Sequence, residues 1–248
     1  MTRIVAFAYG GISYLIFLGT FVSLVGFVGN IAIPKTIDFG PVVSPGEAIA
    51  VDLTLLGLFA VQHSVMARPA FKRWWTRILP PQVERSTYVL VSSLALILLF
   101  WRWRPIPWLI WDVRHPAAVI ALWGLFGIGW LLVLASTFMI DHFDLFGMRQ
   151  VDLYAKGRPY TPSPFRIPAL YRQVRHPIML GFLIAFWATP TMTWGHLLFA
   201  AVTTAYIVIG IRLEERDLVG AHGETYEEYQ KRVPMIVPRF RRGSSETR

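Results

Sequence analysis

Long apolar runs separated by charged segments set the pattern of this chain. The first run covers residues 4–33 without a charged residue, and further runs cover residues 48–66, 86–101 and 117–140. About 20 apolar residues of helix, rising about 1.5 Å each, cross the hydrocarbon core of a bilayer. Because the apolar residues are consecutive rather than alternating, we predict helices and set strands aside.

Two later apolar runs, residues 178–189 and 197–211, are shorter and are separated by residues 190–195. At about 1.5 Å per residue, neither run comfortably spans about 30 Å, so we expect two short helices in one tight hairpin. The predicted fold class is therefore an all-α integral membrane protein. It is a bundle of about five transmembrane elements, the last of them this hairpin, in one domain of residues 1–240 followed by a polar tail, residues 241–248.

Positive charge is strongly one-sided along the chain. Of the 24 Lys and Arg residues, the loops at one end of the predicted bundle contain only Lys35, Arg102, Arg104 and Arg114. Lys and Arg accumulate on the cytoplasmic side of membrane proteins, so the other end, with both termini, is predicted to face the cytoplasm. For a bacterial protein this means a multi-pass protein of the inner (cytoplasmic) membrane.

The composition excludes several classes of protein. The net charge of +9 follows from the positive-inside bias and from anionic lipid headgroups, so no nucleic-acid partner is expected. The chain contains no cysteine, which excludes disulfides, thiolate metal sites and a cysteine nucleophile. The lipid bilayer is an expected partner, and the oligomeric state is left open.

A basic motif opens the predicted hairpin. Arg175 and His176 precede Pro177, and proline suits the first turn of a helix. Free N–H groups and the positive end of the helix dipole at that position favour a carboxylate or a phosphate. The alternative is that Arg175 only anchors the hairpin to lipid headgroups.

Acidic and basic residues follow the hairpin. Arg212, Glu215 and Arg216 share one helical face, which permits a self-contained ion-pair cluster, while Glu214 turns toward the next face. The alternative is a ligand that carries a carboxylate, an ammonium and a sulfonium, because such a ligand needs an arginine for the first group and carboxylates for the others. S-adenosylmethionine has this pattern of charges.

Four motifs carry a specific resemblance. Residues 175–181 (RHPIMLG), 214–215 (EE), 223–229 (GETYEEY) and 232–234 (RVP) resemble the signature of the isoprenylcysteine carboxyl methyltransferase and phospholipid methyltransferase superfamily. The resemblance implies an S-adenosylmethionine site in the C-terminal half, residues 141–240, between the hairpin and the segment that folds under it. The cofactor-binding residues that it implies are Tyr171, Arg175, His176, Pro177, Met179, Gly181, Glu214, Glu215 and Tyr226.

The match to that superfamily is incomplete at two positions. Met179 stands where an aromatic residue is usual, and His222 stands where a phenylalanine is usual. Both departures concern the wall of the expected adenosine pocket.

A narrower resemblance covers most of the chain. Residues 62–69 (QHSVMARP), 71–75 (FKRWW) and 141–147 (DHFDLFG) resemble the bacterial methanethiol S-methyltransferases, membrane enzymes that produce dimethyl sulfide. This resemblance implies a small volatile thiol as the methyl acceptor. Such a substrate needs an apolar pocket open to the membrane.

Transfer to a thiol needs a base or a cation, because the nucleophile is the thiolate. His142, whose ring a neighbouring Asp141 is expected to orient, and His63 are the candidate bases; Arg149 and Arg212 are the candidate cations. The alternative for His63 is a polar contact between helices, and the alternative for His142 is a capped helix end.

Three other functions remain open. A phospholipid amine or an isoprenylcysteine carboxylate as acceptor requires a wide lateral opening between helices. A non-enzymatic membrane module requires that the charged residues be structural ion pairs. A metal site formed by His63, His142 and Asp144 lacks the helical His-x-x-x-His spacing, so no metal is predicted.

Overall fold

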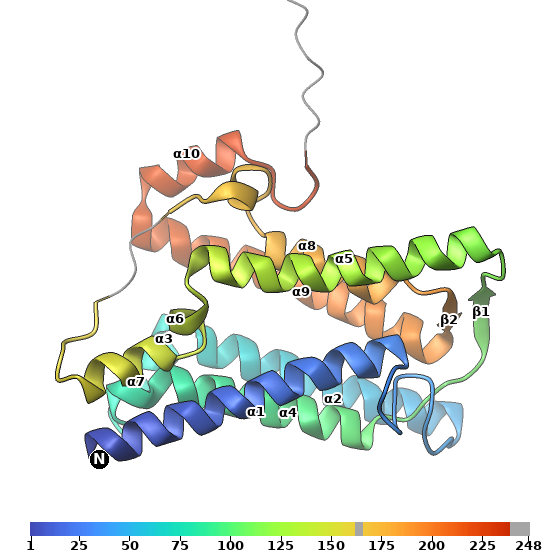
Figure 1. The fold of residues 1–248 in the computed structure, drawn as a ribbon, viewed down its shortest axis with the longest axis horizontal. Coiled ribbons are helices and arrows are strands. Elements are labelled where there is room, and N and C mark those ends of the chain that lie inside the picture. The colour runs from blue at the N-terminus through green and yellow to red at the C-terminus, as the bar shows by residue number, and fades with distance from the viewer. Residues whose placement is uncertain (162–165, 239–248) are drawn as a thin grey trace, which may run out of the picture.

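The computed structural model describes residues 1–161 and 166–238, and the predicted polar tail of residues 241–248 lies outside them. Within the described residues, five helices are long and apolar enough to cross a membrane, which confirms the predicted fold class. They lie side by side along the long axis of the molecule (Figure 1). They are α1 (Arg3–Gly29), α2 (Pro45–Ala67), α4 (Glu84–Arg102), α5 (Pro116–Ile140) and α9 (Trp194–His222).

Short elements gather at one end of the bundle, where the basic segments lie (Figure 1). Proline, glycine and charged residues interrupt the apolar pattern there and keep these helices short. They are α3 (Pro69–Trp75), η1 (Pro81–Val83), α6 (His142–Leu145), α7 (Met148–Ala155), η2 (Ala169–Arg172) and α10 (Glu224–Arg232).

A two-stranded antiparallel sheet lies at the opposite end. It pairs β1 (Leu109–Asp112) with β2 (Thr191–Thr193), with Leu109 opposite Thr193. Setting strands aside was therefore wrong for these loops: they lie outside the helices, and their Trp, Ile and Thr residues favour strands. The pairing holds the turn of the hairpin at the end opposite the basic segments.

The two arms of the hairpin differ in length. The first arm, α8 (Pro177–Trp187), has 11 residues, as expected of a short helix. The second arm, α9, has 29 residues, so the prediction of two short helices was wrong. The apolar pattern ends at Ile211, but Leu, Glu and Arg residues favour helix, and α9 continues until Gly223, whose φ is 55°.

Glycines set the closest contact between helices, that of α5 with α8. A Cβ added at Gly181 would lie 2.7 Å from the carbonyl oxygen of Gly129, and a Cβ added at Gly129 would lie 2.7 Å from the nitrogen of Ala185. Small residues of this kind let membrane helices approach closely. Gly181, which the family resemblance places at the cofactor, therefore packs α8 against α5.

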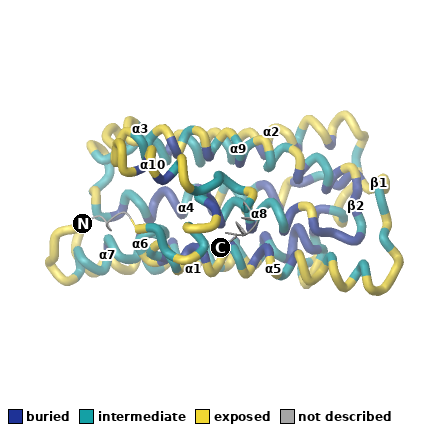
Figure 2. The backbone as a smooth tube through the Cα atoms, turned by 90° about the horizontal axis from the view of Figure 1, so that it is seen from above, coloured by how far each residue is buried: buried dark blue, intermediate teal, exposed yellow. Residues whose placement is uncertain are grey.

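Buried residues lie on the inward sides of the helices, and exposed residues lie on the outer sides of the bundle (Figure 2). The core includes Phe27, Leu99, Trp103 and Phe199, and the indole of Trp103 donates a hydrogen bond to the carbonyl of Ile37 at 3.0 Å. Large apolar residues on the outside are accessible, as faces in contact with lipid should be.

Candidate active site

A buried ion-pair cluster joins the feet of α8 and α9. The Nε of Arg175 donates to Oε1 of Glu215 at 2.7 Å, and Nε2 of His176 lies 3.0 Å from the same oxygen. The amide of Gln230 donates to the second oxygen, Oε2, at 3.0 Å. Glu215 therefore pairs across the hairpin, rather than with Arg212 and Arg216 on its own helix.

The segment after α9 folds back under α8, as the family resemblance implies. The main-chain N–H groups of Arg175 and His176 donate to the carbonyls of Pro234 at 2.9 Å and Met235 at 3.1 Å. The hydroxyl of Tyr229 donates to the carbonyl of Tyr171 at 2.6 Å. The N–H groups of Arg175 and His176 therefore donate to main-chain carbonyls and are not available to an anion at the start of α8.

Glu214 has a different environment from its neighbour. Its side chain is 49% exposed, and its Oε2 lies 3.7 Å from Nδ1 of His176, so most of its acceptor capacity is open. Burial, followed by the charge of Glu214 and the nearby Tyr229, raises the pKa of Tyr171, which keeps this phenol neutral. An accessible carboxylate beside neutral aromatic side chains is chemically suited to a sulfonium.

The remaining predicted cofactor residues are near this region. Tyr226 is buried on α10, and its ring centroid lies 5.7 Å from that of Tyr229. Pro177 and Met179 lie on the first turn of α8. The guanidinium of Arg212 is exposed and has no ion-pair partner in the described part of the chain.

His63 lies in a polar network between α2 and α4. Its Nε2 is 2.8 Å from the hydroxyl of Tyr88, and its Nδ1 is 3.1 Å from the hydroxyl of Ser92. Phe59 stacks on the imidazole, and Tyr206 of α9 meets it edge-on with ring centroids 6.5 Å apart. The polar contact between helices expected as one alternative is therefore present.

An apolar cavity of about 110 Å³ adjoins this network between α2 and α9. Phe59 and Tyr206 line the cavity and also contact His63. An apolar cavity of about 150 Å³ accommodates a molecule such as benzene, so this one suits a ligand of a few heavy atoms. Its other lining residues are Leu53, Leu56, Gly57, Ala60, Val202 and Thr203.

His142 is buried in a second network, beside the end of α5. Its Nε2 lies 2.8 Å from the hydroxyl of Tyr14, its Nδ1 lies 2.8 Å from the hydroxyl of Thr137, and Phe138 stacks on the ring at 4.1 Å. Burial lowers the pKa of His142, which favours the neutral imidazole. Both ring nitrogens thus have hydroxyl partners.

Asp141 does not take the position expected for orienting His142. Its Oδ1 accepts a hydrogen bond from the main-chain N–H of Asp144 at 3.1 Å and so caps α6. Its Oδ2 lies 4.0 Å from Nε of Arg149. The structure therefore brings Asp141 and Arg149 together, while hydroxyls orient the imidazole.

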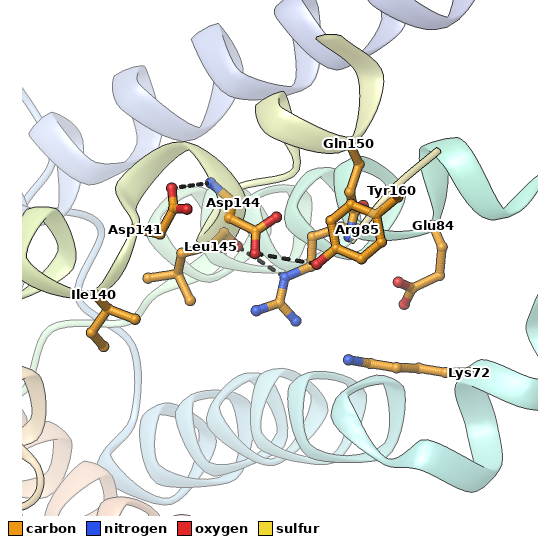
Figure 3. Close-up of a pocket in the computed structure, with 9 residues that line it drawn as sticks. All are labelled: Lys72, Glu84, Arg85, Ile140, Asp141, Asp144, Leu145, Gln150 and Tyr160. Atoms are coloured by element: carbon orange, nitrogen blue, oxygen red, sulfur yellow. Dashed lines mark hydrogen bonds between the residues drawn. The ribbon is translucent and has the colours of Figure 1, made fainter. Parts of the chain in front are cut away.

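A second cavity, of about 320 Å³, opens between α3, α4, α6 and α7 (Figure 3). Of its charged residues, Asp141 and Asp144 were singled out from the sequence, whereas the cations Lys72 and Arg85 were not. Lys72 lies inside the FKRWW motif, which was the available signal. The full lining is Lys72, Glu84, Arg85, Ile140, Asp141, Asp144, Leu145, Gln150 and Tyr160.

The metal alternative gains no support. Across residues 1–161 and 166–238, no three His, Asp or Glu side chains gather as metal ligands would. His63 and His142 contact separate sets of hydroxyl groups.

Comparison with known proteins gives a consistent result. Residues 53–234 match the family described as NnrU protein. Methanethiol S-methyltransferase of Mycobacterium tuberculosis is 57% identical over 238 residues, covering 96% of this chain and 98% of the relative. Methanethiol S-methyltransferase 2 of Bradyrhizobium diazoefficiens is 55% identical, covering 96% of this chain and 92% of the relative.

A more distant relative is the mouse protein Nurim, which is 32% identical over 179 residues, or 69% of this chain and 68% of Nurim. No solved structure matches the chain. The full-length relatives confirm the resemblance stated from the motifs.

Proposed function

The chain belongs to the NnrU protein family, and we propose that it is a membrane methyltransferase that uses S-adenosylmethionine to convert methanethiol to dimethyl sulfide. The observation that carries this proposal is the identity of 50–57% to relatives named methanethiol S-methyltransferase, over nearly the full chain in most cases. All motifs singled out for the cofactor and the acceptor lie within the aligned length.

The size of the apolar cavity supports a small acceptor. Clefts for drug-sized ligands occupy about 300–1,000 Å³, whereas the cavity between α2 and α9 has about 110 Å³. A thiol with one carbon fits this volume. A prenyl or acyl chain does not fit it. The volume therefore favours a small thiol over a phospholipid or an isoprenylcysteine as the acceptor.

The residues available at the hairpin fit the proposed cofactor. When bound, S-adenosylmethionine supplies a methyl group on a positively charged sulfur. Glu214 would offer its half-exposed carboxylate to that positive charge, while Arg175 and Glu215 hold the surrounding segments in place. Tyr171 and Tyr226, whose pKa values burial raises, would contribute neutral aromatic side chains to the site.

Among the candidate bases, His63 is best placed to activate the thiol. Its contacts with Phe59 and Tyr206 put its ring beside the apolar cavity. The thiol proton would pass to Nε2 of His63, which the hydroxyl of Tyr88 positions. The resulting thiolate sulfur would take the methyl group as the bond between that methyl and the donor sulfur breaks, which would leave neutral S-adenosylhomocysteine. His142, which was the first choice from the sequence, also has hydroxyl partners on both ring nitrogens, but its contacts Tyr14, Thr137 and Phe138 do not line the apolar cavity.

We also propose that the site faces the cytoplasm in a bacterial inner membrane. The support is the concentration of Lys and Arg at the end of the bundle that holds α3, α6, α7 and α10. This is also the side on which a soluble cofactor is available.

The test is an assay of dimethyl sulfide in the headspace above purified, detergent-solubilised protein with S-adenosylmethionine and methanethiol. The wild-type protein should form dimethyl sulfide, and His63→Ala should lose most activity at low pH and regain part of it at high pH, where solvent supplies the thiolate. A pH-independent loss in His63→Ala would indicate positioning only. Absence of dimethyl sulfide with the folded wild-type protein would refute the function.

A further inference from the structure

The cavity of about 320 Å³ beside α6 has no role in the steps above. Its volume lies at the lower end of the range for ligand-binding clefts, about 300–1,000 Å³. It is formed by the start of α4, the short helix α3, and the segment from the end of α5 through α7 (Figure 3). What could bind in this cavity follows from the groups on its two walls.

One wall presents two cations, Lys72 and Arg85, and one carboxylate, that of Glu84, which lies near Lys72 without forming an ion pair with it in the described residues. The Nε of Arg85 donates to the carbonyl of Leu145 at 3.0 Å, which fixes the guanidinium so that its terminal nitrogens point into the cavity (Figure 3). The ammonium of Lys72 points into the same space (Figure 3). Neither side chain has an ion-pair partner within 4.0 Å among the residues that the structure describes. Burial and then the charge of Arg85 lower the pKa of Lys72.

The facing wall presents two acceptor atoms that receive no hydrogen bond. Oδ1 of Asp144 and Oε1 of Gln150 are buried and accept no hydrogen bond in the described part of the chain. The nearest cation to Asp144 is Arg149, whose Nη1 lies 3.6 Å from Oδ1, beyond hydrogen-bond distance. Its other oxygen, Oδ2, accepts from the hydroxyl of Tyr160 at 3.2 Å. A buried acceptor left unsatisfied costs about 1–3 kcal/mol, so a ligand that donates hydrogen bonds here is favoured.

We propose that this cavity binds an α-amino-acid group, with its carboxylate on Lys72 and Arg85 and its ammonium on Asp144 and Gln150. A simple anion would satisfy the first wall and worsen the second, and a simple cation would do the reverse. A zwitterion satisfies both. Two molecules could supply this group: the methyl donor, through its methionyl end, or a free amino acid such as methionine. Only the first of these rests on the proposed function.

Binding measurements on the full-length protein in detergent distinguish these sources. Calorimetry would compare S-adenosylhomocysteine, 5′-methylthioadenosine, which lacks the amino-acid group, and L-methionine. Lys72→Met and Asp144→Asn should each weaken S-adenosylhomocysteine at least about tenfold and leave 5′-methylthioadenosine unchanged if the donor's methionyl end lies here. If the two substitutions weaken the binding of L-methionine but not that of S-adenosylhomocysteine, the cavity is a separate amino-acid site.

Exposed ion pairs supply matched controls. Lys156 and Asp152 pair at 2.7 Å on the surface of α7, so Lys156→Met and Asp152→Asn make the same chemical changes away from the cavity and should change no affinity. Lys72→Arg keeps the positive charge and should retain binding. It serves as the second variant at this position if Lys72→Met folds poorly. Gel filtration and the thermal midpoint report the fold of each variant.

Two results would overturn the proposal. One is an unchanged affinity for S-adenosylhomocysteine and for L-methionine in Lys72→Met and Asp144→Asn. The other is a site for inorganic phosphate that depends on Lys72 but not on Asp144, which would indicate an anion site only. Formation of dimethyl sulfide by the wild-type protein is scored separately, so failure here leaves the proposed function standing, and the reverse also holds.

Discussion

At the residue scale, two adjacent carboxylates have different roles. Both oxygens of Glu215 are engaged, by Arg175, His176 and Gln230, and its side chain is 10% exposed. Glu214 is 49% exposed, and its Oε2 lies 3.7 Å from Nδ1 of His176. The first stabilises the hairpin, and the second is available to a ligand.

Substitution separates these roles. Glu215→Gln should lower the free energy of unfolding by about 1–3 kcal/mol, because Arg175 is left with a buried charge that no carboxylate balances. Glu214→Gln should change the free energy of unfolding by no more than about 0.5 kcal/mol relative to the wild type, and it should weaken the binding of S-adenosylmethionine. Denaturant unfolding in detergent and calorimetry measure the two effects. Equal losses of stability in both variants would contradict the assignment.

The buried His142 predicts a pH dependence of stability. Its pKa is lowered by burial from an ordinary value of about 6.5, so below that pH the unfolded chain binds more protons than the folded protein. His142 therefore makes its full contribution to the free energy of unfolding above about pH 6.5. This contribution is lost as the pH falls from there through the lowered pKa of the folded protein. Thermal midpoints between pH 7.5 and 5.5 should fall in the wild type and fall less in His142→Gln. Identical slopes would show that His142 titrates normally.

The sequence was a better guide to which polar residues belong to the candidate site than to which residues they contact. Arg175, His176 and Glu215 were named, and they do meet. The partners of His142 were missed because Tyr14 precedes it by 128 positions on α1, and packing of α1 against α6 is not visible in local spacing. Lys72 and Arg85 were counted only as positive charges, since their shared cavity exists only after α3 and α4 are positioned.

At the element scale, close packing fixes the hairpin. Helix α8 lies against α5 through Gly129 and Gly181, and the β1–β2 pairing holds its far end. Hydropathy predicted the helices but not the full length of α9, because charge ends an apolar run without ending a helix. The strands were missed because segments of three and four residues carry too little pattern.

A glycine substitution tests this packing. Gly181→Leu should destabilise the protein by about 1–3 kcal/mol, because the new side chain meets the backbone of α5. Gly124→Leu on α5 is the matched control, since no atom lies within 4 Å of a Cβ added there. Thermal unfolding in detergent compares them. A control that is as destabilised as Gly181→Leu would mean that the close contact is unimportant.

At the scale of the whole molecule, charge and fold agree on a direction in the membrane. The N-terminus and the short helices α3, α6 and α7 lie at one end of the long axis, and the β1–β2 sheet lies at the other (Figure 1). Under the proposed function, a water-soluble cofactor would enter from one side, and the apolar cavity between α2 and α9 would be left to an acceptor dissolved in lipid.

Topology can be tested because the native chain contains no cysteine. Val42→Cys lies in an exposed position between α1 and α2, and Lys231→Cys lies exposed on α10. An impermeant thiol reagent added outside the cytoplasmic membrane should label the first variant and spare the second until the cells are broken. Labelling of both variants in intact cells would refute the orientation.

The central claim is the identity of the methyl acceptor, and a competition in one vessel tests it most directly. Purified protein would receive methyl-labelled S-adenosylmethionine together with methanethiol, a phosphatidylethanolamine and a prenylcysteine. We predict that label accumulates in dimethyl sulfide and that the lipid and the prenylcysteine remain unlabelled. Label in either of those two, with none in dimethyl sulfide, would contradict the account.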